Sequence, residues 1–301
     1  MTKRLEGVMA PVVTTFTAAG ELDLDAFRAN VRAHLAAGLH GVVLCGSTGE
    51  NPLVDDAERR RLIEVARAEV PVDRWLIVAT GAESTRQVLA RNADAARLGA
   101  DAALVVSPHY YTPNMTADVL WSHYRTIADA APLPLLVYNI PKYTHFVFPS
   151  ELIGELAQHH NVIGMKDSSG DLELLTTYLV HQSERFTVLT GSGQALAEGM
   201  AAGARGGILA VALFAPALAL ATYAARRSGD LAAAARSQAT LFPMAKEIVG
   251  VLGVPAIKVA LDRVGLHGGA PRAPLLPLDG AGVARVEALL AEAGLTAAVA
   301  A

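Results

Sequence analysis

The sequence predicts an α/β protein, a (β/α)8 TIM barrel with a C-terminal helical extension. Apolar runs of strand length alternate with longer stretches at helical spacing, which is the pattern of parallel βα units. The runs are continuously apolar rather than alternating, as expected for strands that are covered on both faces. A chain of 301 residues has room for one such barrel and a small appendage.

The expected elements follow one another in a regular order. Strands are predicted over residues 8–16, 41–45, 75–79, 102–107, 135–138, 162–165, 186–190 and 207–211. Helices are predicted between them over residues 24–37, 55–69, 85–98, 117–130, 149–158, 172–181 and 194–201. The helical stretches repeat their apolar residues every three or four positions, whereas the strands are short unbroken apolar runs.

A weak internal repeat supports this order of units. A helical stretch stops at Gly38, Gly99 and Gly203, and an apolar strand begins a few residues after each glycine. Glycine accepts the left-handed conformation in which many helices end. Only helical patterning continues after the eighth strand. We therefore expect a barrel over residues 1–216 and a helical extension packed on it over residues 217–301.

The structural rival is a doubly wound open sheet, which also alternates strands and helices. Its dinucleotide fingerprint is incomplete here, because Leu196 stands where the third glycine after Gly191 and Gly193 is required. The glycine loop at residues 46–50 lacks the lysine of a phosphate-binding P-loop. The barrel remains the predicted fold.

Composition and charge indicate small-molecule partners. The 25 Lys and Arg residues oppose 29 Asp and Glu, so there is no basic field to hold nucleic acid or an anionic membrane. The single cysteine, Cys45, cannot form an internal disulfide, which suits a reducing compartment. The first residues show no secretory signal pattern. We therefore expect a cytoplasmic protein.

The uncharged stretch at residues 206–225 is long enough to span a bilayer. Pro216 divides it into a short strand-like piece and an alanine-rich piece with a helical bias. Alanine contributes little transfer energy compared with leucine. We expect a buried strand that leads into a packed helix, and no membrane partner.

Lys166 is the most informative position, because it directly follows the apolar run at residues 162–165 and so lies at a strand end. Lysine is rarely buried without a purpose. Burial favours the neutral amine, which is the form that condenses with a carbonyl group to an imine. The alternative is a structural lysine paired with Asp167, and residue type and position alone do not decide between the two.

Tyr138 ends the preceding strand, and Pro141 closes that segment. The phenol and the amine of Lys166 would then lie on adjacent strands at the carboxyl end of the barrel, where barrel enzymes carry their active sites. A tyrosine there can shuttle a proton. A rim aromatic with a satisfied hydroxyl group is the alternative.

Two loops carry further candidate residues. Glycines around Ser47 and Thr48 allow backbone N–H groups and two hydroxyls to converge on a carboxylate, although an ordinary turn that caps the next helix would use the same residues. Tyr110 and Tyr111 follow the fourth strand and could cover a site or a subunit contact. The nine histidines show no metal-binding spacing, so we expect no metal.

Taken together, these segments resemble the dihydrodipicolinate synthase and N-acetylneuraminate lyase family, whose members are pyruvate-dependent Schiff-base enzymes on (β/α)8 barrels. The likeness extends over nearly the whole chain. It rests on the segments PVVTTF, GSTGE, SPHYY, YNIP, GMKDSSGD and GGI, which occur in family order. The resemblance implies that Lys166 forms the imine and that no metal or organic cofactor takes part.

The resemblance also implies roles for the neighbouring residues. Tyr138 would be the proton shuttle, with Thr48 and Tyr110 completing a hydroxyl relay and Tyr110 reaching into a neighbouring subunit's site. Ser47 and Thr48 would hold the pyruvate carboxylate, and the carbonyl group of Ile208 would line the pocket. A homotetramer, built as a dimer of dimers, is the assembly that the resemblance implies.

Departures from the synthase pattern concern the second substrate. In the synthase, an arginine two residues after the proline of the YNIP motif helps to bind that substrate's carboxylate, whereas this chain has Tyr143, a neutral phenol in the substrate pocket. Asp56 and Arg59 align with the histidines that bind feedback lysine, which argues against lysine inhibition. The segments GMKDSSGD and HGGAPRAPL are closer to the 4-hydroxy-2-oxoglutarate aldolase branch.

The leading functional hypothesis is therefore a class I lyase that cleaves or forms a 4-hydroxy-2-oxo acid, of the 2-oxo-3-deoxy acid or 4-hydroxy-2-oxoglutarate type. Its small-molecule partners would be pyruvate and an aldehyde. The alternatives are a synthase that condenses pyruvate with aspartate semialdehyde and a 2-oxo-3-deoxy sugar acid dehydratase. A non-catalytic sensor of small acids is a further alternative, and the presence of both Lys166 and Tyr138 argues against it.

Overall fold

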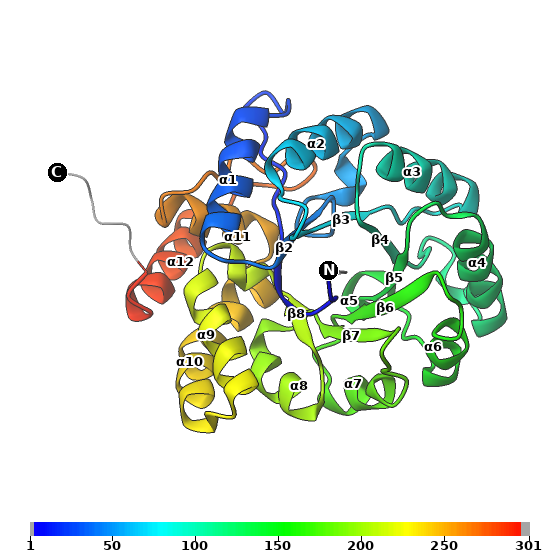
Figure 1. Cartoon of the computed structure of the whole chain (residues 1–301). Coiled ribbons are helices and arrows are strands. Elements are labelled where there is room, and N and C mark those ends of the chain that lie inside the picture. The colour runs from blue at the N-terminus through cyan, green and yellow to red at the C-terminus, as the bar shows by residue number, and fades with distance from the viewer. Residues whose placement is uncertain (1–2, 296–301) are drawn as a thin grey trace.

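Eight short parallel strands close into a barrel in the computed structural model, which describes residues 3–295 (Figure 1). Each strand pairs with the next along the chain, and β8 pairs with β1. The strands are β1 (Gly7–Pro11), β2 (Gly41–Leu44), β3 (Trp75–Ala79), β4 (Ala102–Val106), β5 (Leu135–Asn139), β6 (Val162–Asp167), β7 (Thr187–Thr190) and β8 (Gly206–Ile208). The predicted (β/α)8 barrel is confirmed.

Helices surround the strands, and those after the barrel gather on one side of it (Figure 1). The barrel helices are α1 (Leu24–Ala36), α2 (Asp56–Glu69), α3 (Thr85–Arg97), α4 (Ala117–Ala130), α5 (Pro141–Thr144), α6 (Ser150–Leu156), α7 (Leu172–Leu179), α8 (Leu196–Ala202) and α9 (Pro216–Ser228). They are followed by α10 (Leu231–Met244), a π-helical segment (Ala245–Leu252), α11 (Val254–Arg263) and α12 (Gly280–Glu292). The predicted C-terminal helical extension is confirmed.

Capping side chains explain where several helices begin. The Asp55 carboxylate accepts a hydrogen bond from the Glu58 N–H at 2.8 Å, and the Asp55 N–H donates to the Glu58 carboxylate at 3.1 Å. This reciprocal capping box satisfies two backbone N–H groups at the start of α2. Helix α2 therefore starts one residue after the predicted position, because Asp55 is its cap. Side-chain caps also precede α1, α3, α4 and α7, at Asp23, Ser84, Thr116 and Asp171.

The three glycines that were predicted to end helices all have positive φ. Their φ angles are 93° at Gly38, 86° at Gly99 and 126° at Gly203. A residue with a Cβ atom rarely adopts such angles, so glycine allows the chain to turn from each helix toward the next strand.

Two predicted strands continue three or more residues past the observed ends. Strand β1 ends at Pro11, and the rest of the predicted run 8–16 forms a buried loop in which the Thr14 hydroxyl donates to the Gly49 carbonyl. The predicted strand 207–211 ends at Ile208 and continues as a 3-10 turn over Ala210–Leu213. Both segments are apolar because the barrel rim and the C-terminal helices cover them, and the apolar run itself does not mark where strand pairing stops.

The apolar stretch at residues 206–225 forms β8, the 3-10 turn and the first turns of α9, so the predicted strand leads into the predicted helix through a turn that was not predicted. Within residues 3–295, no helix combines the length and the apolar character needed to cross a membrane.

The extension contacts the barrel through polar side chains as well as through apolar packing. Asn30 of α1 donates to the His267 carbonyl at 2.6 Å and accepts from the His267 N–H at 3.0 Å. Helix α10 of the extension packs on α8 and α9. The division into 1–216 and 217–301 stays a prediction, and residues 1–2 and 296–301 of these two units lie outside the described residues.

The inside of the barrel is filled rather than open. A buried apolar cluster includes residues from most of the strands, among them Met9, Val43, Ile77, Leu104, Leu136, Leu189 and Ile208. Tyr138 belongs to the same cluster and lies near the carboxyl end of β5. Because the interior is packed, a ligand can enter only at a rim of the barrel.

Candidate active site

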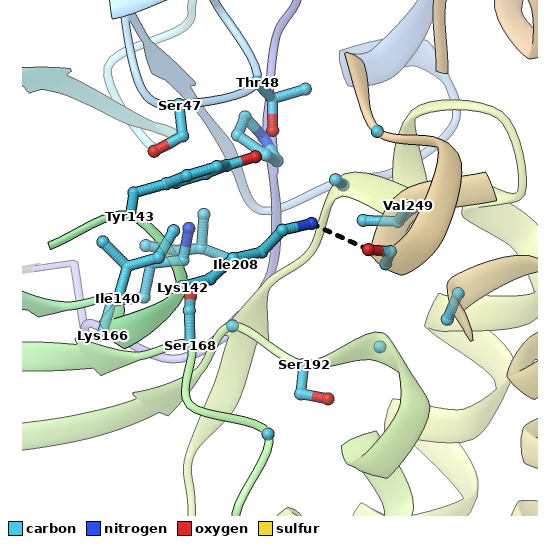
Figure 2. A pocket seen from close by; sticks show the side chains of 18 of the residues that line it. Ser47, Thr48, Ile140, Lys142, Tyr143, Lys166, Ser168, Ser192, Ile208 and Val249 are labelled. Carbon is cyan, nitrogen blue, oxygen red and sulfur yellow. Dashed lines mark hydrogen bonds between the residues drawn. The ribbon is translucent and has the colours of Figure 1, made fainter. Parts of the chain in front are cut away.

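A pocket of about 270 Å³ opens at the carboxyl end of the barrel (Figure 2). It brings together strand ends, the loops that follow them and part of the C-terminal extension. Its polar lining residues are Ser47, Thr48, Tyr138, Lys142, Tyr143, Lys166, Ser168, Ser169, Ser192 and Gln194. Its apolar and glycine lining includes Ile140, Gly191, Ile208, Ala245, Val249, Gly250 and Ile257.

Lys166 and Tyr138 are neighbours in this pocket because β5 and β6 pair in register. Tyr138 lies directly opposite Lys166 in the strand ladder. The Lys166 amine donates a hydrogen bond to the Tyr138 hydroxyl at 3.3 Å and lies 4.4 Å from the centre of the Tyr138 ring. Both residues are buried, with exposed fractions of 6% and 4%. The strand pairing therefore places the amine and the phenol side by side at the pocket floor.

Asp167 does not form the ion pair with Lys166 that a purely structural lysine would use. The Asp167 carboxylate instead accepts hydrogen bonds from the Asn139 amide and the Ser169 hydroxyl, both at 2.7 Å. Burial raises the pKa of Asp167, and these two hydrogen bonds oppose the shift. Among the described residues, no carboxylate lies within ion-pair distance of Lys166. Asp167 thus fixes the loop after β6 and leaves the amine available.

The loop with Ser47 and Thr48 lines the opposite side of the pocket, after β2 (Figure 2). It is held in a tight conformation, because Cys45 and Glu50 both have left-handed φ angles, 53° and 56°. A buried ion pair of 2.6 Å joins the Glu50 carboxylate to the Lys258 ammonium of α11. The loop is therefore fixed at both ends, and its two hydroxyl residues lie in the pocket.

Tyr143 and Ile208 also line the pocket, and their substrate-binding role stays a prediction. Ile208 is the last residue of β8 and is fully buried. Tyr143 borders this pocket and a neighbouring cavity of about 360 Å³. Burial, and to a smaller extent Tyr138, raises the pKa of Tyr143, so its side chain stays a neutral phenol.

Tyr110 is the one predicted site residue that lies outside this pocket. Its side chain is 78% exposed and packs edge to face on Tyr111, with ring centres 5.0 Å apart. The single chain places both rings on the surface, after β4. The predicted entry of Tyr110 into a neighbouring subunit's site stays a prediction.

Five polar residues that line the pocket were not predicted as site residues: Lys142, Ser168, Ser169, Ser192 and Gln194. Lys142 and Ser168 carried a usable signal, because each follows a strand end that was already assigned to the site. Ser192 and Gln194 follow β7, to which no candidate residue had been assigned. The wall formed by the π-helical segment had no signal, because only the tertiary fold brings that segment to the strand ends.

The groups that converge here suit covalent chemistry on a carbonyl compound. A lysine amine can add to a ketone, and the adjacent phenol can move the protons that imine formation requires. Within residues 3–295, no cluster of three or more His, Cys, Asp or Glu side chains is arranged to hold a metal ion. A buried amine beside a phenol at the carboxyl end of a (β/α)8 barrel is the arrangement of a class I, imine-forming lyase.

Comparison with known proteins gives a consistent result. The model of the Dihydrodipicolinate synthetase family matches residues 4–293. A 4-hydroxy-tetrahydrodipicolinate synthase from an Exiguobacterium species is 34% identical over 281 residues, which cover 93% of this chain and 95% of the relative. An uncharacterized DapA-like lyase from Halobacterium salinarum is 38% identical over 291 residues, with coverages of 97% and 95%.

A solved structure agrees over the same length. A dihydrodipicolinate synthase from Acinetobacter baumannii, complexed with pyruvate, superposes with a TM-score of 0.92 at 28% identity, covering 97% of this chain and 100% of that chain. The chain therefore belongs to the Dihydrodipicolinate synthetase family. It is a carbon–carbon or carbon–oxygen lyase of class I, and enzymes of this family form an imine on a lysine without a metal or an organic cofactor.

Proposed function

We propose that this lyase cleaves or forms a 4-hydroxy-2-oxo acid through an imine between Lys166 and the pyruvate part of the substrate. The observation that carries the proposal is the hydrogen bond of 3.3 Å between the Lys166 amine and the Tyr138 hydroxyl in a pocket without acidic lining residues. Such a pocket suits an anionic substrate, because a carboxylate would meet hydroxyl and amine donors and no like charge.

The reaction follows from these positions. The Lys166 amine adds to the C2 carbonyl, Tyr138 relays a proton to the new hydroxyl group, and water leaves to give the protonated imine. Tyr138 then takes the proton of the C4 hydroxyl while the C3–C4 bond breaks and its electron pair moves toward the imine nitrogen. An aldehyde leaves. Protonation at C3 and hydrolysis of the imine release pyruvate and restore the amine.

Other residues have supporting roles in the proposal. Ser47 and Thr48 hold the carboxylate next to the reacting carbonyl, and Ile208 lines the pocket beneath it. Thr48 also continues a hydroxyl relay to Tyr110 from a second subunit of a cytoplasmic homotetramer. The 78% exposed Tyr110 and the 66% exposed Tyr111 support a contact with another subunit, because large aromatic groups are enriched at interfaces.

Condensation of pyruvate with aspartate semialdehyde is the second candidate, since the Exiguobacterium relative is a 4-hydroxy-tetrahydrodipicolinate synthase. Tyr143 departs from the synthase pattern, because a neutral phenol cannot itself make the bidentate contact that an arginine makes with a carboxylate. Dehydration of a 2-oxo-3-deoxy sugar acid would start from the same imine. Coupled assays for pyruvate release, for aspartate semialdehyde consumption and for loss of water separate the three reactions.

Reductive trapping tests the imine. Borohydride added with pyruvate should fix a pyruvate-derived adduct on Lys166, located by peptide mass mapping. Lys166→Ala should abolish the adduct and lower turnover by roughly 10³-fold or more, because the covalent route is lost. Tyr138→Phe should still form the adduct and turn over roughly 10²-fold more slowly, because only proton transfer is impaired.

Circular dichroism of both variants is the control for folding. An adduct on a different lysine would refute the proposed mechanism. Trapping on Lys166 in a protein that turns over no 2-oxo acid would instead indicate a sensor of small acids.

A further inference from the structure

Lys142 brings a second cation to the same pocket. It follows Pro141 in α5, directly after the strand that carries Tyr138. Its ammonium donates a hydrogen bond of 2.8 Å to the Gly250 carbonyl of the π-helical segment. Figure 2 shows this side chain reaching from the barrel toward the extension, beside Val249. Lys142 therefore spans the pocket above the level of the strand ends.

The charged side chains that line the pocket are all positive. Lys142 and Lys166 are lining residues, and no Asp or Glu among residues 3–295 lines the pocket. Within the described part of the chain, Lys142 has no carboxylate within ion-pair distance. Lys142 is exposed, and a cation without a protein counterion at the edge of a pocket favours an anionic ligand.

The contact with Gly250 uses one of the N–H donors of the Lys142 ammonium group. The Gly250 carbonyl lies near the C-terminal end of the π-helical segment, where Pro255, five residues further on, has no N–H to donate. Lys142 supplies that hydrogen bond. An ammonium group has three N–H donors, so two remain for a ligand in the pocket.

We propose that Lys142 determines specificity by binding a carboxylate at the aldehyde end of the substrate. The enzyme then acts on 2-oxo acids that carry a second negative charge beyond C4, with Lys166 at one end of the substrate and Lys142 at the other. This inference rests on the proposed function. The neutral Tyr143, whose ring centre lies 5.6 Å from the Lys142 ammonium, forms a wall beside this contact and does not supply a charge.

A matched pair of substrates tests the charge directly. 4-Hydroxy-2-oxoglutarate ends in a carboxylate, and 4-hydroxy-2-oxopentanoate ends in a methyl group at the same position. We expect Lys142→Gln to lower kcat/KM for the dicarboxylate by roughly 10- to 100-fold, mainly through KM, because a hydrogen bond between charged groups is lost. The variant should stay within about twofold of the wild type on the methyl analogue. Lys142→Arg should keep most of the preference.

The control variant is Lys246→Gln, which removes a lysine of the extension that does not line the pocket. This variant should leave kcat/KM unchanged for both substrates. Equal losses on both substrates in Lys142→Gln, or retained preference for the dicarboxylate, would refute the role of Lys142. If Lys142 only holds the Gly250 carbonyl, Lys142→Gln should lower kcat/KM equally on both substrates. Lys142→Arg shows whether the fold tolerates a change at this position.

Borohydride trapping with pyruvate separates this inference from the proposed function. The adduct on Lys166 should form equally in the wild type and in Lys142→Gln, because the pyruvate part does not reach Lys142. If the wild type gives no adduct, the proposed function fails. If the adduct forms and the wild type prefers the methyl analogue or an uncharged sugar acid, only the inference about Lys142 fails.

Discussion

Gly191 limits the space around the reactive amine. It follows β7, and its N–H donates to the Asp167 carbonyl at 2.6 Å. A Cβ atom placed on Gly191 would lie 2.8 Å from the Lys166 Cε atom and would overlap the Ser168 hydroxyl. Both side chains belong to the pocket, so the absence of a side chain at Gly191 sets the position of the amine.

Gly191→Ala should therefore impair imine formation more than it impairs folding. We expect the rate of borohydride trapping to fall by roughly 10- to 100-fold, because small displacements of reacting groups carry large kinetic costs. The measurement is the time course of pyruvate adduct formation. Gly280→Ala is the control, since a Cβ at Gly280 meets no atom within 4 Å. An unchanged trapping rate in Gly191→Ala would show that the amine is not confined in this way.

Single residues also show what the sequence could and could not indicate about the site. Lys166 and Tyr138 were predictable, because each directly follows or ends an apolar strand and parallel strands end at one rim. The contact made by Lys142 was not predictable, because its position after the Tyr138 strand places it at the rim but does not reveal that the Gly250 carbonyl lies beside it. Lys142 and Gly250 are 108 residues apart, so their hydrogen bond leaves no local pattern in the sequence.

At the level of elements, the strands were predicted better than their ends. Apolar runs located all eight strands, because burial on both faces requires them to be apolar. The run at residues 8–16 nevertheless continued past β1, since the loop after Pro11 is buried as deeply as the strand. Where ladder pairing stops depends on hydrogen-bond partners, and the side chains alone do not reveal them.

Helix α1 carries a buried histidine with a consequence for stability. His34 is 1% exposed, and its Nε2 atom has no hydrogen-bond partner in the described part of the chain. Burial lowers the pKa of His34 to about 4. In the unfolded chain His34 takes up a proton near its ordinary pKa of 6.5, whereas in the folded chain it stays neutral down to about pH 4. The contribution of His34 to the free energy of unfolding is therefore fully present above pH 6.5 and is lost as the pH falls toward 4.

His34→Leu should weaken this dependence. We expect the free energy of unfolding of the wild type to fall by about 3 kcal/mol more than that of the variant between pH 7 and pH 4. Urea denaturation at a series of pH values measures the difference. His160→Leu, at an exposed position, is the control. Parallel curves for the wild type and His34→Leu would mean that His34 is not kept neutral by the fold.

At the level of the whole molecule, the extension is joined to the barrel by buried charges. The Lys258 ammonium of α11 is 2.6 Å from the Glu50 carboxylate and donates to the Thr14 and Ala270 carbonyls at 2.9 and 2.7 Å. Lys258 and Glu50 are 1% and 2% exposed. Burial lowers the pKa of Lys258, and the hydrogen bond with Glu50 opposes that shift.

Breaking this pair on one side should be costly. Lys258→Met should lower the free energy of unfolding by about 3 to 5 kcal/mol, because the Glu50 carboxylate is left buried without its partner. The double variant with Glu50→Gln should lose less than the sum of the two single losses. Urea denaturation of the four proteins measures this coupling.

The exposed ion pair between Arg263 and Glu287, with side chains 46% and 48% exposed, is the matched control. Arg263→Met should cost less than about 1 kcal/mol. Additive losses in the Glu50 and Lys258 variants would contradict a coupling between the extension and the glycine loop.

The π-helical segment contributes one wall of the pocket, although it lies about eighty residues beyond Lys166 in the chain. Reactivity and selectivity are thus encoded in separate stretches of the polypeptide. Substitutions at Val249 or its neighbours can reshape the space offered to the aldehyde while the strand that carries the amine keeps its sequence. For an engineer who wants a different substrate, this distant stretch is the natural place to randomise first.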